Sequence, residues 1–150
     1  MVDVVPMQVT HFSALVVPVQ GRLVAIPQAA VAGIATVSST PPLPLAQPWV
    51  GGVVQFPQGP CLLIELFGSE APTLVQRSVT AIAVALPGSV VLALCADGAG
   101  QLEQVSLLPP AGRASVACPA SWLRPGRTAN GRDVLVLQIE ALAHSLREAA

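Results

Sequence analysis

The sequence predicts an all-β fold, a barrel or a sandwich of short strands, with one helix at the C-terminus. Apolar runs of strand length recur along the 150 residues, and turn-forming segments separate them, with 12 glycines and 15 prolines in total. Strand and helix patterns do not alternate along the chain, which argues against a parallel α/β sheet. Helical spacing of apolar residues is clear only near the C-terminus.

Five strands are expected in the first half of the chain. They span residues 12–19, 22–26, 29–37, 50–54 and 61–67. The turn Gln20-Gly21 joins the first two strands, which predicts a hairpin. The third segment is compatible with strand or helix, and Gly33 with its β-branched neighbours favours a strand. The proline-rich segment 38–48 is expected to be a loop, 55–60 a turn and 70–76 a polar connection.

Four strands and the helix are expected in the second half. The strands span residues 80–86, 90–96, 102–108 and 134–139, with 97–100 as a turn. Pro87-Gly88-Ser89 predicts a hairpin between the first two of them. The segment 113–132 contains four arginines and Trp122 among prolines and glycines, so it is expected to be irregular. Ile139, Leu142 and Leu146 fall at helical spacing, which predicts a helix from 140 to the C-terminus with one apolar face.

The chain is expected to be soluble and cytoplasmic, with no insertion into a membrane. Residues 78–96 carry no charge and match the length of a membrane span. The Pro87-Gly88-Ser89 turn at their centre would break a helix, so two strands are the better interpretation. The N-terminus has Asp3 in place of a basic region and lacks a cleavage site, which argues against a signal peptide.

Charged residues are scarce. They make up 10% of the chain against 53% hydrophobic residues, there is no lysine, and the net charge is −1. A chain without a basic patch has no long-range field to attract nucleic acid or anionic lipid. Much of the surface must be apolar or neutral, which favours a protein that works inside an assembly.

The residues that could perform catalysis are few and scattered. The three cysteines, Cys61, Cys95 and Cys118, are odd in number and widely spaced, so they predict neither a disulfide framework nor a metal site. His11 and His144 are expected to be solvated. The sequence therefore predicts a binding module, with no catalytic residues, no metal and no cofactor. A small enzyme that uses a cysteine nucleophile is the alternative from another class.

Two acidic residues receive structural interpretations. Asp97 precedes Gly98, which predicts a turn held by a local side-chain hydrogen bond. Glu65 interrupts an apolar run, so it is expected to face outward or to pair with an arginine.

The order of elements resembles the CheW-like family of chemotaxis coupling proteins, from about Phe12 to Leu146. Each similar segment is weakly informative alone, but their order and spacing together are specific. The segments are the opening hairpin with Gly21, residues 26–34, the loop with Leu43-Pro44 and Pro48-Trp49-Val50 and Gly52, and residues 62–66, 92–97, 107–110 and 134–146.

The resemblance implies two five-stranded SH3-like barrels packed around a shared core, with a C-terminal helix. Residues 1–150 would form a single domain of two intertwined sub-barrels, whose boundary remains open. The resemblance implies no catalysis. Members of this family bridge the regulatory domain of a CheA-type histidine kinase and the cytoplasmic tip of a chemoreceptor, and related adaptors serve gliding and type IV pilus pathways.

The sequence departs from the family pattern at the positions that the resemblance assigns to partner binding. Where the family has G-x-x-N-L-R-G, this chain places Pro57 in place of the arginine and Gln58 in place of the following glycine. Gly33 replaces a glutamate in the V-x-E-I segment. By resemblance, the partner-binding residues are Val31, Gly33, Ile34, Gly52, Phe56, Pro57 and Gln58. Losing a charge-assisted contact at an interface centre costs about 2 kcal/mol or more.

Two roles are compatible with these departures. The first is a divergent chemosensory adaptor whose contact with the receptor is weakened or altered. The second is an accessory CheW-like protein of a gliding or type IV pilus system that lacks the standard contacts with receptor and kinase. Neutral drift would also explain the substitutions, but divergence is favoured because both charged sites have changed.

Overall fold

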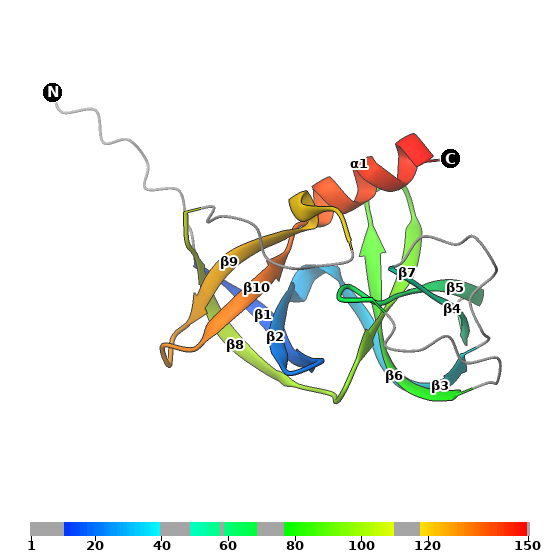
Figure 1. Cartoon of the computed structure of the whole chain (residues 1–150), viewed down its shortest axis with the longest axis horizontal. Helices are drawn as coiled ribbons and strands as arrows, with labels where there is room; N and C mark the ends of the chain where they lie inside the picture. Colours follow the sequence, from blue (N-terminus) through cyan, green and yellow to red (C-terminus); the bar gives the residue numbers. More distant parts are fainter. Residues whose placement is uncertain (1–10, 40–48, 58, 69–76, 110–117, 150) are drawn as a thin grey trace, which may run out of the picture.

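The computed structural model describes residues 11–39, 49–57, 59–68, 77–109 and 118–149 (Figure 1). The elements in these ranges are β1 (His11–Val19), β2 (Arg22–Pro27), the 3₁₀ turn η1 (Gln28–Ala30), β3 (Val31–Ser39), β4 (Val50–Phe56), β5 (Gly59–Ile64), β6 (Arg77–Leu86), β7 (Val90–Ala96), β8 (Gln101–Leu107), the 3₁₀ turn η2 (Ala120–Trp122), β9 (Leu123–Thr128), β10 (Asp133–Leu137) and α1 (Ile139–Ala149). The segments 40–48 and 70–76, expected to connect strands, lie outside the described residues.

The strands form two closed five-stranded barrels. Barrel 1 has the order β1-β2-β10-β9-β8, and barrel 2 has the order β3-β4-β5-β7-β6. Each barrel contains one parallel pair, β2 with β10 and β5 with β7, and its other pairs are antiparallel. Barrel 1 uses both ends of the chain, and barrel 2 is built from the middle (Figure 1). The expected pair of five-stranded barrels with a terminal helix is confirmed.

Three apolar layers fill the molecule, one inside each barrel and one between them. The interior of barrel 1 holds small side chains, such as Ala14 and Ala25, because a five-stranded barrel encloses little space. Larger side chains fill the layer that both barrels and the helix share, among them Leu15, Ile82 and Trp122. Along β1 successive side chains alternate between these two layers. Both faces of the strand are buried, which explains why its sequence is an apolar run.

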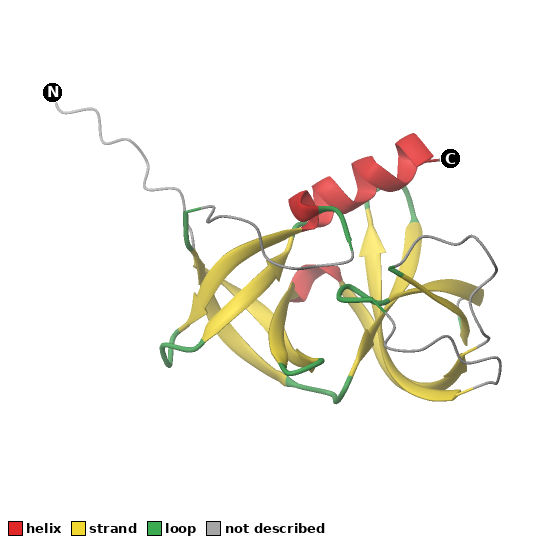
Figure 2. Ribbon diagram, viewed as in Figure 1, coloured by secondary structure: helices red, strands yellow, loops and turns green. Residues whose placement is uncertain are grey.

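The helix α1 packs against the shared layer through Leu142 and Ala143, which are 1% and 3% exposed. Figure 2 shows it on one side of the molecule, extending from barrel 1 toward barrel 2. The expected terminal helix is confirmed, and it begins at Ile139, which had been expected to end the last strand. Within the described ranges, no helix has the length and apolar character needed to cross a membrane.

Hydrogen bonds link the β1–β2 turn of barrel 1 to two segments that follow strands of barrel 2. Gln20 and Gly21 have φ angles of 49° and 78°, as in the two-residue turns that tighten hairpins. The backbone N–H of Gln20 donates to Asp97 Oδ2 over 2.6 Å, and its side-chain amide donates to the Gly68 carbonyl over 2.7 Å. Asp97 thus binds a residue 77 positions away, and the expected local hydrogen bond was wrong.

Strand β9 lies inside the segment 113–132, which was expected to be irregular. Pro125 lacks an N–H, but its carbonyl accepts a hydrogen bond from the Leu108 N–H over 2.9 Å. A Cβ on Gly126 would lie 2.7 Å from Val136 Cγ2, so only glycine allows the strands to approach this closely. Pairing with β8 and β10 therefore overrides a local composition that disfavours a strand.

Glu65 is buried, and the expected outward position was wrong. The preceding strand ends at Ile64, and the Glu65 N–H donates to the Trp49 carbonyl over 2.7 Å. Glu65 is 4% exposed, and its side chain lies against Gly51. A Cβ added to Gly51 would stand 2.8 Å from Glu65 Cγ. Gly51 therefore provides the space that this carboxylate occupies.

Candidate functional site

Barrel 2 contains every described residue that the resemblance assigns to partner binding. Val31, Gly33 and Ile34 belong to β3, and Gly52 and Phe56 belong to β4. These strands are neighbours in the barrel, joined through the pair Ser39 and Val54. Pro57 follows β4 directly, and Gln58 lies outside the described residues. The fold therefore places the two predicted segments on adjacent strands.

On β3, the exposed member is Ile34. It is 45% exposed, whereas its cross-strand partner Ile82 on β6 is fully buried in the shared layer. Val31 is partly buried against the same layer. A Cβ built on Gly33 would come no closer than 3.9 Å to Ala83 Cβ, an ordinary contact distance. The fold thus leaves room for a Cβ at position 33, and packing does not require glycine there.

On β4, the predicted residues divide into structural and exposed ones. Gly52 has φ 122° at a register shift between Val50 and Gly52, a backbone conformation that favours glycine. Phe56 is 3% exposed and fills the interior of barrel 2. Pro57 is exposed. Among the predicted residues that the structure describes, Ile34 and Pro57 are therefore the exposed ones.

Sequence reasoning missed three exposed apolar side chains. Val53 on β4 is 41% exposed, Val90 on β7 is 48% exposed, and Leu102 on β8 is 59% exposed. The signal for Val53 is its outward position between two buried neighbours on the same strand. We call Ile34, Val53 and Pro57 the β3–β4 surface. Neither strand contains a charged residue, so these two strands themselves offer a partner apolar contacts and hydrogen bonds.

In the described residues, two of the three thiols are buried and both imidazoles are exposed. Cys61 and Cys118 are buried, and burial raises the pKa of both thiols, that of Cys118 to about 11. A thiol with a raised pKa is a poor nucleophile at neutral pH. His11 Nδ1 lies 2.6 Å from Ser106 Oγ at the surface, and His144 is exposed. No cluster of three potential metal ligands occurs in the part of the chain that the structure describes.

Comparison with known proteins identifies a structural relative. No protein-family model and no curated protein sequence matches this chain. The crystal structure of the scaffolding protein TtCheW from Thermoanaerobacter tengcongensis matches it with a TM-score of 0.64 and 12% sequence identity. The match covers 87% of this chain and 91% of TtCheW. The expected resemblance is confirmed for the architecture, and this divergent chain has the fold of a CheW scaffolding protein.

Proposed function

We propose that this chain is a non-catalytic adaptor of a bacterial chemosensory pathway, acting in the cytoplasm as one domain of residues 1–150. The adaptor holds the regulatory domain of a CheA-type histidine kinase near the cytoplasmic tip of a chemoreceptor. One observation carries the proposal: two closed barrels share a core in an arrangement that matches TtCheW over most of both chains. A fold whose described part contains no cluster of potential metal ligands is compatible with scaffolding.

The β3–β4 surface is the proposed contact for these partners, and it binds in an altered way. Pro57 stands where the family pattern has an arginine, so this position offers neither a charge nor a side-chain donor. Ile34 and Val53 offer apolar area in its place. Binding is therefore expected to depend weakly on salt, because no ion pair forms at the centre of the contact.

A kinase assay tests the proposal. The purified protein is added to a CheA-type kinase and chemoreceptor arrays from the same organism, and kinase autophosphorylation is measured. An adaptor raises the rate in the presence of receptor and restores its response to receptor ligand. No binding and no change in phosphorylation would refute the coupling role.

Matched variants locate the contact. Ile34→Asp introduces a charge on β3 at a residue that is 45% exposed, and we expect it to weaken binding at least tenfold. Val90→Asp makes the same kind of change at 48% exposure on β7, outside the proposed contact, and should leave binding unchanged. Pro57→Arg restores the charge of the family pattern and is expected to strengthen receptor binding. Equal effects of Ile34→Asp and Val90→Asp would contradict the assignment.

The second candidate is an accessory protein of a gliding or type IV pilus system. The geometry at Gly33 favours it, because a Cβ there would make only an ordinary contact at 3.9 Å, so packing does not demand the loss of the family's glutamate. This role predicts that the protein binds neither the standard kinase nor the standard receptor, while removal of the gene abolishes gliding or twitching. Normal surface motility in the deletion strain would exclude it.

A further inference from the structure

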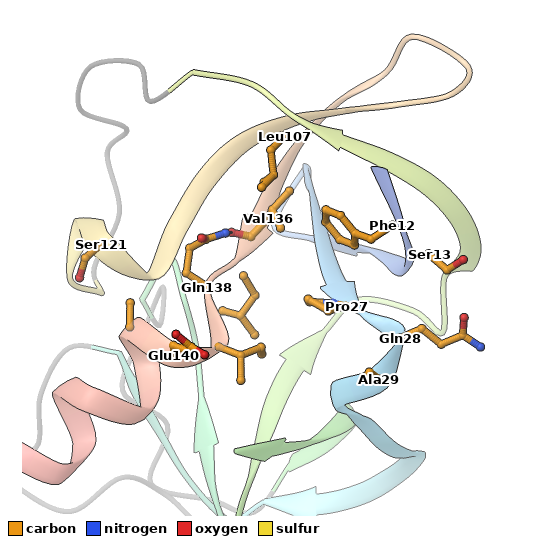
Figure 3. A pocket seen from close by; sticks show the side chains of 13 residues that line it. Phe12, Ser13, Pro27, Gln28, Ala29, Leu107, Ser121, Val136, Gln138 and Glu140 are labelled. Atoms are coloured by element: carbon orange, nitrogen blue, oxygen red, sulfur yellow. The ribbon is translucent and has the colours of Figure 1, made fainter. Parts of the chain in front are cut away.

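A groove of about 1020 Å³ opens at one end of barrel 1. Phe12 of β1, Leu107 of β8 and Val136 of β10 face it from three strands (Figure 3). Ala29 of η1 forms one wall, and the first turn of α1 with Glu140 forms another. The groove lies on barrel 1, whereas the β3–β4 surface belongs to barrel 2.

The small side chains inside barrel 1 explain why this end is open. Ala14 and Ala25 are fully buried in the interior, where they occupy little of the cross-section. Phe12 and Leu107 are only partly buried at the mouth, although they pack against the same interior cluster. The mouth therefore presents apolar side chains to any group that enters it, as the openings of barrels that bind ligands do.

The charge of the groove indicates what could enter it. Among the described residues that line it, Glu140 is the one that carries a charge, and its side chain is exposed. Asp97, Glu103 and Asp133 each accept a hydrogen bond or an ion pair within the protein. Glu140 has no such contact with the described residues. A cation brought by a partner would complement it, and this chain contains no lysine of its own.

We propose that this groove binds a segment of a partner protein that presents a bulky apolar side chain close to a lysine or arginine. The apolar side chain enters the mouth over Phe12, and the cation faces the Glu140 carboxylate. The proposal rests on the geometry of barrel 1 and does not depend on a chemosensory role.

A peptide selection tests this proposal. A phage-displayed library of random 12-residue peptides is selected on the immobilised full chain, and the dissociation constants of the enriched peptides are measured by fluorescence anisotropy. We expect enriched sequences that place leucine, phenylalanine or tryptophan within four residues of lysine or arginine. Absence of enrichment, or enrichment of acidic sequences, would overturn the proposal.

Substitutions locate the binding site. Ala29→Trp fills the groove with an indole and should weaken binding at least tenfold, and Ser121→Trp serves as a second blocking variant if the first fails to fold. Glu140→Gln should weaken binding two- to fivefold, the range of an exposed ion pair. Glu140→Arg should bind peptides in which the lysine is replaced by glutamate. Val90→Trp, at a position on barrel 2 that is 48% exposed and lies outside the β3–β4 surface, should leave peptide binding unchanged.

Two further measurements would recognise other occupants of the groove. Sedimentation velocity reveals a second copy of this chain as a concentration-dependent dimer that Ala29→Trp abolishes. Peptide binding that requires deletion of residues 1–10 reveals the chain's own N-terminal segment. Either result, or peptide binding that Ala29→Trp and Glu140→Gln leave intact, would refute a partner segment.

Discussion

Gly100→Ala is expected to destabilise the protein far more than Gly21→Ala, although the two glycines have the same backbone conformation. Gly100 has φ 73° and Gly21 has φ 78°, both in the left-handed region. Gly100 lies where the chain passes from β7 of barrel 2 to β8 of barrel 1. A Cβ at this position would stand 2.1 Å from the Val16 carbonyl oxygen and 2.7 Å from Val17 Cγ1. A Cβ on Gly21 would meet nothing within 4 Å.

The magnitudes follow from these two geometries. Both substitutions place alanine in a left-handed conformation, which costs about 1 kcal/mol. Only Gly100→Ala also forces atoms together, and the nearest is a backbone oxygen that no side-chain rotation can move. Forced overpacking in a core costs about 1–3 kcal/mol, and a backbone clash belongs at the upper end. We expect a loss of about 1 kcal/mol for Gly21→Ala and about 4 kcal/mol for Gly100→Ala.

Urea unfolding followed by tryptophan fluorescence measures the difference, because Trp122 is fully buried in the shared layer. A gap of about 3 kcal/mol between the variants corresponds to a factor of more than 100 in the unfolding equilibrium constant. Gly88→Ala is a second control, with φ 90° and open space around its Cβ. If Gly100→Ala and Gly21→Ala cost the same within about 0.5 kcal/mol, the close contact between the β7–β8 connection and β1 does not exist.

Three further predictions concern stability. Burial raises the pKa of the Cys118 thiol from 9.0 to about 11, so the folded thiol keeps its proton where the unfolded one loses it. The free energy of unfolding should therefore fall as the pH rises from 9 to 11. Cys118→Ala should reduce this fall, as measured by thermal melts at several pH values. The chain has no lysine or tyrosine that would titrate in the same range. Asp97→Ala removes the acceptor of the Gln20 N–H and should cost about 1–2 kcal/mol in urea unfolding, against less than about 1 kcal/mol for the exposed Asp133→Ala. Leu142→Ala should cost about 3 kcal/mol in the same assay and lower the melting temperature, since the residue is 1% exposed under α1.

Most of the strands could be predicted because the barrels share a core. Strands β1 and β2 bury one face inside barrel 1 and the other in the shared layer, so residues 14–19 and 23–27 are all apolar. An apolar run bounded by turn residues is a reliable local signal. Strand β9 lacks this signal, because Pro125 and Gly126 occur in its middle. Its position depends on strands from other parts of the chain, which a local pattern does not contain.

The candidate surfaces could be predicted less well, for a related reason. Exposure depends on which face of a strand the neighbouring elements cover. Ile34 and Ile82 are paired across β3 and β6, yet one is 45% exposed and the other is fully buried, because the shared layer covers only β6 at this point. The groove on barrel 1 combines residues from β1, η1, β8, β10 and α1, which only the closed topology brings together.

The fold requires the residue type at a position that matches the family pattern, and it does not require it at the positions that depart from the pattern. Gly52 matches the pattern, and its φ of 122° at a register shift requires glycine. Gly33 and Pro57 depart from it, and neither is fixed by packing: a Cβ added at Gly33 would make only an ordinary contact, and Pro57 is exposed. Matches that the fold imposes establish architecture, whereas positions that the fold leaves free can respond to a partner. For the proposed adaptor role, Gly33 and Pro57 are therefore positions at which binding can change while the two-barrel scaffold stays the same.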